Sequence, residues 1–225
     1  MISAAAALLL ALQAAQPLSP FAQKKAETLL RDKLPCLGCH ELGGDGGRIA
    51  PGLTDVAGRR DRDYVARMIA DPQRTVPGTV MPRVVMPPET RSLIVAYLAE
   101  RPLAPASGSP TPHSPLPLPR ASTDTTGAGL YARYCAACHG ATGNGDGPNA
   151  RFLPVPPTRH ADAPLMAQRA DDVLYDAIAG GGGVMGKSPR MPPFGATLSD
   201  RELRALVRHI RTLCRCEGPA WSRDP

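Results

Sequence analysis

The sequence "YCAACHG", residues 134–140, decides the fold, because two cysteines stand three positions apart and a histidine follows at once. The same spacing occurs earlier in "PCLGCHE", residues 35–41. On a helical turn, residues i and i+3 point the same way. Each cysteine pair can therefore bond the two vinyl groups on one edge of a porphyrin, with the histidine beneath the iron. This spacing is the signature of c-type haem attachment.

The repeated pentapeptide predicts two covalently bound haem c groups, one in each half of the chain. The expected attachment residues are Cys36, Cys39, Cys135 and Cys138, and the expected first axial ligands are His40 and His139. Three other interpretations fit less well. A structural zinc site needs four ligands, and each half offers two cysteines and one histidine. A thioredoxin-type pair needs a neighbouring βαβ unit, and the sequence shows no strand pattern. Plain disulfides would leave both histidines unexplained.

The composition favours two small domains that need help to fold. A chain of 225 residues suits one large domain or two small ones, and two matching sites favour two. Only 4% of the residues are aromatic. Small domains with so few large side chains are marginal on apolar burial alone. A haem would give each core a large apolar disc to pack around.

The formal net charge of +6 divides evenly, with 13 basic and 10 acidic residues both in 19–103 and from 104 onward. No cationic patch with interleaved aromatic side chains is present in the sequence, which argues against nucleic acid as a partner. The last expected helix carries arginines that form a solvated face or steer an acidic partner: Arg201, Arg204, Arg208, Arg211 and Arg215.

The N-terminus contains an apolar run from Ala4 to Ala15, followed closely by Pro17. We interpret residues 1–16 as a signal peptide, with an uncleaved N-terminal helix as the alternative, and expect an exported, periplasmic protein. The run is shorter than the roughly 20 apolar residues that cross a bilayer. The sequence therefore predicts no transmembrane span.

Residues 104–123 are rich in proline, which favours an extended tether. This linker separates a first domain at 20–103 from a second at 124–217, and a tail follows at 218–225. Both halves repeat one order: an amphipathic helix before the pentapeptide, a middle helix, and a last helix after a Met-Pro pair. Asp61 is expected to be an N-cap, and Ser199 with Glu202 a capping box. The predicted fold class is all-α, with two small helical domains.

A second axial ligand is expected on each iron, and methionine raises the reduction potential because its thioether favours the ferrous state. In the second half we favour Met191, in the loop before the last helix, over Met185. In the first half we favour Met81 over Met86, since Met81 leaves the longer lead to the final helix.

Two histidines outside the pentapeptides are alternatives to these methionines. They are His160, in a polar loop, and His209, near a helix C-terminus.

The chain resembles di-haem cytochromes c built from two class I cytochrome c domains in tandem. The resemblance rests on "CLGCH", "CAACH", "IAPGL" at residues 49–53 and "MPPFGATLSDRELRALVRHIR" at residues 191–211. It implies a proline whose carbonyl accepts a hydrogen bond from the proximal imidazole. Pro51 matches that position in the first half. In the second half Pro157 is favoured over Pro154 and Pro156.

The C-terminal "LCRCEGP", residues 213–219, has no histidine after its cysteines and is therefore not a third haem site. Exported thiols tend to oxidise. For Cys214 and Cys216 an intramolecular disulfide, an intermolecular one and free thiols all stay open.

Together these features predict an electron carrier rather than an enzyme. It would relay single electrons between redox protein partners, one of which could be a membrane-bound complex. Two alternatives stay open. One is a di-haem enzyme such as a peroxidase, with one open axial position. The other is a haem-bearing electron-transfer subunit of a dehydrogenase or oxidase complex.

Overall fold

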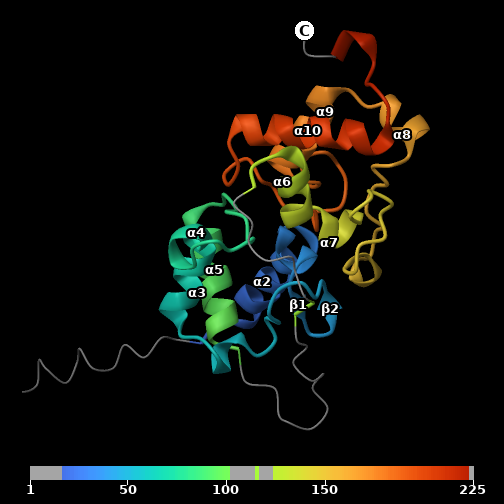
Figure 1. The fold of residues 1–225 in the computed structure, drawn as a ribbon. Helices are drawn as coiled ribbons and strands as arrows, with labels where there is room; N and C mark the ends of the chain where they lie inside the picture. The colour runs from blue at the N-terminus through green and yellow to red at the C-terminus, as the bar shows by residue number, and fades with distance from the viewer. Residues whose placement is uncertain (1–16, 102–114, 117–123, 223–225) are drawn as a thin grey trace, which may run out of the picture.

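The computed structural model describes residues 17–101, 115–116 and 124–222, and about half of this part of the chain is helical, with few strands (Figure 1). The predicted signal peptide, most of the predicted linker and the end of the tail lie outside the described residues. No helix in the described ranges is both long and apolar enough to cross a membrane. The helical content agrees with the predicted fold class at this level.

The N-terminal half, defined here as residues 17–101, contains four α-helices, two 3-10 turns and two short strands among its described residues. The α-helices are α2 (Pro20–Asp32), α3 (Arg62–Ala70), α4 (Pro72–Thr75) and α5 (Pro88–Ala99). The other elements are η1 (Pro35–Gly38), η2 (Val56–Gly58), β1 (Glu41–Leu42) and β2 (Asp45–Gly46).

The C-terminal half, defined here as residues 124–222, has the longer final helix. Its α-helices are α6 (Gly127–Tyr134), α7 (Ala136–His139), α8 (Ala163–Ala167), α9 (Asp171–Gly180) and α10 (Asp200–Cys214). Its 3-10 turns are η3 (Ala150–Phe152) and η4 (Ala220–Ser222).

Side-chain caps set the starts of the main helices. The Asp61 carboxylate accepts a hydrogen bond from the Tyr64 N–H at 2.7 Å, which confirms it as the N-cap of α3. At the start of α10, Ser199 and Glu202 form the predicted capping box, in which each side chain binds the other's backbone N–H. These contacts satisfy N–H groups that have no partner within the helix.

The same packing scheme occurs in both halves. In each, the helix before the pentapeptide packs against the final helix: α2 against α5, and α6 against α10. The middle helices α3 and α9 also contact those final helices. The buried apolar side chains form one cluster in each half. The two pentapeptides therefore follow equivalent helices over separate cores.

A small hairpin departs from the strand-free expectation. Strands β1 and β2 pair antiparallel, with Leu42 opposite Asp45. The two residues between them, Gly43 and Gly44, have φ values of 61° and 85°. A two-residue turn with positive φ at both positions matches the twist of the flanking strands, and glycine adopts it without strain. Strands of two residues are too short to leave an alternating pattern in the sequence.

The two halves lie against each other, with α7 beside the elements of the N-terminal half (Figure 1). Polar groups make the contact. The Arg133 guanidinium donates to the Gly78 carbonyl at 3.0 Å, and the Arg83 N–H donates to the Thr197 hydroxyl at 2.8 Å. Asp45 forms an ion pair with Arg190 at 2.8 Å. The halves are therefore not joined by a tether alone.

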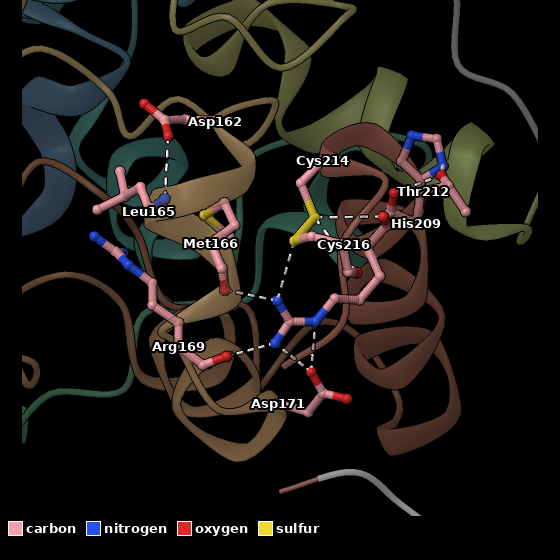
Figure 2. Close-up of a disulfide and its surroundings, with 10 residues drawn as sticks. Asp162, Leu165, Met166, Arg169, Asp171, His209, Thr212, Cys214 and Cys216 are labelled. Atoms are coloured by element: carbon pink, nitrogen blue, oxygen red, sulfur yellow. Dashed lines mark hydrogen bonds and ion pairs between the residues drawn. A yellow bond between two sulfur atoms is a disulfide. The ribbon is translucent and has the colours of Figure 1, made fainter. Parts of the chain in front are cut away.

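A disulfide between Cys214 and Cys216 follows the last turn of α10 (Figure 2). The sequence left three states open for these cysteines, and the structure has the intramolecular disulfide. The Arg211 side chain beside it donates to the Met166 carbonyl at 2.8 Å and to the Asp171 carboxylate at 2.7 Å. The end of α10 is thereby fixed to α8 and to the start of α9.

Replacing Leu206 tests the core of the C-terminal half. This side chain is completely buried, so Leu206→Ala should lower the free energy of unfolding by about 2–5 kcal/mol through lost burial and a residual cavity. Denaturant unfolding measures the change. The control is Arg208→Ala on the exposed side of the same helix, with an expected change within about 0.5 kcal/mol. Equal losses in the two variants would contradict this packing.

Thiol alkylation with mass analysis tests the disulfide. In unfolded, unreduced protein, Cys214 and Cys216 should stay unmodified, because both sulfurs are bonded. Both should become reactive after reduction. Alkylation of either residue without a reductant would show that the bond is absent.

Candidate haem site

Each pentapeptide forms one tight turn that places its histidine immediately after the second cysteine. The His40 N–H donates to the Cys36 carbonyl at 3.0 Å, and the His139 N–H donates to the Cys135 carbonyl at 2.9 Å. The turn belongs to η1 in the first half and to α7 in the second. Two sulfurs and an imidazole are thus carried by five consecutive residues in both halves.

Both histidine rings are held by a backbone carbonyl. Nδ1 of His40 lies 2.7 Å from the Pro51 oxygen, and Nδ1 of His139 lies 2.9 Å from the Thr158 oxygen. A carbonyl oxygen only accepts hydrogen bonds, so we assign the ring proton to Nδ1 in both residues. In that tautomer the ring lone pair is on Nε2, the atom that binds iron when the other nitrogen is held by a second partner.

The contact to His139 differs from the sequence prediction by one residue. Pro51 lies where the resemblance places it, but Thr158 supplies the carbonyl in the second half instead of Pro157. The Pro157 carbonyl faces Gly145, where a Cβ would lie 2.8 Å from its oxygen. Consecutive carbonyls of extended chain point to opposite sides, so only one of the two can reach the ring.

A cavity of about 630 Å³ lies next to the second pentapeptide. Its volume is within the range of about 300–1,000 Å³ that ligand sites occupy. The lining includes Cys135, Cys138, His139, Leu174, Met191 and Phe194. A large apolar space reached by two thiols, an imidazole and a thioether matches the shape and chemistry of a covalently attached haem.

The methionines are placed differently around this cavity. Met191 lines it and Met185 does not. In the N-terminal half, Val80 and Pro82 line the same cavity while Met81 between them does not. The Met81 backbone is held on both sides, because its carbonyl accepts from the Gln73 side chain at 2.6 Å and its N–H donates to the Thr79 hydroxyl at 3.2 Å.

The four pentapeptide cysteines are half-buried free thiols. Burial raises the pKa of Cys36 to about 11 and the pKa values of Cys39 and Cys135 to about 12. A reactive redox or metal-binding cysteine instead has a lowered pKa. Among the described residues, no three or more His, Cys, Asp or Glu side chains are grouped to hold a metal ion. The raised pKa values weigh against a thioredoxin-type pair.

His160 is a site residue whose position the sequence did not reveal. It is buried, its ring stacks on His139 with centroids 4.2 Å apart, and its Nδ1 lies 3.0 Å from the Tyr131 hydroxyl. Burial, together with the neighbouring His139, lowers the pKa of His160 to about 2. It packs against the proximal ring, so it is less suited than Met191 to bind iron from the opposite face. No local pattern in the sequence marks its position.

The helical fold and these turns are typical of a protein that holds a covalently attached haem. More particularly, residues 122–210 match the family model described as cytochrome c oxidase, cbb3-type, subunit III. This match supports a cytochrome c domain of the cbb3 type in the C-terminal half of the chain. No curated protein and no solved structure matches the chain. Domains of this type generally carry electrons on haem c between redox proteins, and they are usually exported or membrane-associated.

Proposed function

We propose that the protein is a periplasmic di-haem c-type cytochrome that relays single electrons between redox partners. Each half would be a small class I cytochrome c-like domain, at 20–103 and 124–217. The Pro-rich segment 104–123 would join them, a signal peptide at 1–16 would direct export, and 218–225 would be the tail. The haem ligands and attachment sites would be Cys36, Cys39, His40 and Met81 (alternative Met86), and Cys135, Cys138, His139 and Met191 (alternative Met185).

One observation carries the proposal: a single site geometry occurs in both halves. In each, a tight turn carries the cysteines, and the Nδ1 of the next histidine meets a backbone carbonyl, 11 residues further on in the first half and 19 in the second. In each, the preceding helix packs on the final helix. The family match covers only the second occurrence, and the first supports a second domain by its geometry.

The chain would bind and tune the cofactor with its own groups. Each cysteine S–H would add across one vinyl double bond, so that sulfur bonds one carbon and the hydrogen goes to its neighbour. Bound haem would supply a one-electron couple between ferric and ferrous iron. The Thr158 and Pro51 carbonyls would fix the ring planes of the histidines and make Nε2 more basic. Apolar residues such as Phe194 would keep water from the site, which raises the reduction potential by disfavouring the extra charge of the ferric state.

The family description favours a second candidate, a haem-bearing subunit of an oxidase complex. A subunit would remain with an oxidase when native membranes are gently solubilised, whereas a free carrier would be recovered alone in the periplasmic fraction. The peroxidase alternative needs an open axial position, and Met191 in the cavity lining weighs against one at the second site.

Mass analysis of the mature protein tests the haem count. We expect two haem additions, and one addition when Cys135 and Cys138 are both changed to Ser. Changing Cys36 and Cys39 to Ser should remove the other, because each pair attaches its own porphyrin. Haem on the C-terminal half alone would refute the di-haem proposal and leave the cytochrome c domain intact.

Substituting Met191 tests the axial ligand of the second haem. Met191→Ala should abolish the sulfur-to-iron charge-transfer band of that haem in the ferric near-infrared spectrum and let carbon monoxide bind its ferrous form. Met185→Ala, which changes a methionine outside the cavity lining, is the matched control and should do neither. The opposite pattern would assign the ligand to Met185. Carbon monoxide binding to the native wild-type protein would favour the peroxidase alternative.

A further inference from the structure

Asn149 is a completely buried residue that bonds to both halves of the protein. Its side-chain Nδ2 donates to the Gly38 carbonyl at 2.9 Å, and its Oδ1 accepts from the Arg48 N–H at 2.8 Å. The same Nδ2 also donates to the Cys138 sulfur at 3.3 Å. One amide group therefore links an attachment cysteine of the second half to the pentapeptide backbone of the first.

Arg190 makes a second link to the same pentapeptide. Its guanidinium is 9% exposed and contacts both carboxylate oxygens of Asp45, at 2.8 and 3.2 Å. It also donates to the Leu37 carbonyl at 3.2 Å. Leu37 and Gly38 are the two residues between the cysteines of the first pentapeptide. Side chains of the C-terminal half thus bind both of their carbonyls.

The close approach of the two halves requires glycine at position 38. A Cβ on Gly38 would lie 1.9 Å from the Arg190 backbone oxygen. The equivalent position of the second pentapeptide is occupied by Ala137, so the attachment turn itself accepts a side chain there. Glycine is therefore needed at position 38 because the backbone of the other half lies too close for a side chain.

Both attachment turns also face one space. Cys39 and Gly38 of the first pentapeptide line the cavity that holds Cys138 and His139 of the second. The two turns are adjacent, although 94 residues lie between the two pentapeptides in the chain.

We propose that Asn149 and Arg190 are positioning residues that fix the two attachment turns against each other, and that the Cys138–Asn149–Gly38 contacts provide the route for direct electron exchange between the two halves. This inference rests on the proposed di-haem function. In the exchange one ferrous iron is oxidised and one ferric iron is reduced by the same electron, and no proton or covalent bond is transferred. Electron tunnelling falls exponentially with distance and is faster through bonds and hydrogen bonds than across a gap. The Asn149 amide supplies a hydrogen-bonded path from the Cys138 sulfur to the Gly38 carbonyl.

The test is intramolecular electron transfer in the full-length di-haem protein. After a photoreductant delivers one electron per molecule, wild type should show a redistribution phase whose rate does not depend on protein concentration. Asn149→Ala should slow that phase, because it removes the amide that bonds to both Cys138 and the Gly38 carbonyl. Gly38→Ala should slow it too, since the added methyl group separates the backbones and removes no polar contact.

Amide hydrogen exchange gives a readout that is independent of electron transfer. The Arg48 N–H, bound to Asn149 Oδ1, should exchange slowly in wild type and faster in Asn149→Ala. Asn144→Ala, which removes an exposed asparagine from the same loop, is the matched control and should change neither readout. If Asn149→Ala does not fold, Gly38→Ala provides the test instead. The attachment turn accepts alanine at this position, since the second pentapeptide has Ala137 there.

The outcomes separate this inference from the proposed function. An unchanged redistribution rate in a variant that keeps two low-spin haems overturns the inference and leaves the di-haem cytochrome standing. Equal hydrogen-exchange rates of the Arg48 N–H in wild type and Asn149→Ala would also overturn the inference, because the bridge formed by the Asn149 side chain to Arg48 and Gly38 would then be absent. A single haem in wild type instead refutes the proposed function, and hydrogen exchange at Arg48 still reports whether the bridge exists.

Discussion

The constraint on which the structure depends is that five consecutive residues must present two sulfurs and one correctly oriented imidazole. A tight turn supplies the spacing, but it leaves the imidazole free to rotate. The loop that follows must therefore return a carbonyl to Nδ1. It does so through Pro51 in one half and Thr158 in the other, although the two loops differ in length. The first loop contains a hairpin and the second contains η3. Both loops nevertheless place a backbone carbonyl against the histidine Nδ1.

Features set by neighbouring residues could be predicted from the sequence. The order of helices, the Asp61 cap and the Ser199–Glu202 capping box depend on contacts within one turn, so their signals lie in adjacent letters. The same holds for the pentapeptides. Even the Pro51 contact was available, because a resemblance to known domains marks its position. These predictions concern what each segment does by itself.

Features that depend on distant contacts could not be predicted in the same way. Whether Pro157 or Thr158 supplies the carbonyl depends on how the extended loop is oriented relative to the His139 ring, which is 19 residues away in the chain. His160 gave no local sign of burial, because its stacking partner is His139. Asn149 lies in a Gly-rich loop with no local sign of burial, yet its side chain is buried and bonds to Gly38 and Arg48 of the other half. The hydrophobic periodicity of the sequence does not reveal such contacts.

The polar character of the contact between the halves also has a physical meaning. The two apolar clusters stay separate, so each half buries its own core and the contact mainly sets orientation. A buried arginine such as Arg190 is costly unless it is paired, and Asp45 supplies the pair. The hydrogen bond from Arg190, with Arg31 nearby, holds the pKa of Asp45 below its ordinary value.

A carboxylate with a lowered pKa stabilises the folded state at pH values above its ordinary pKa. Its contribution is lost only as the pH falls through the lowered value. The Arg190–Asp45 pair therefore stays charged across neutral and mildly acidic pH. Because Arg190 also binds the Leu37 carbonyl, the ion pair and the first attachment turn share one guanidinium. The orientation of the halves is thus coupled to the geometry of the first attachment turn through Arg190.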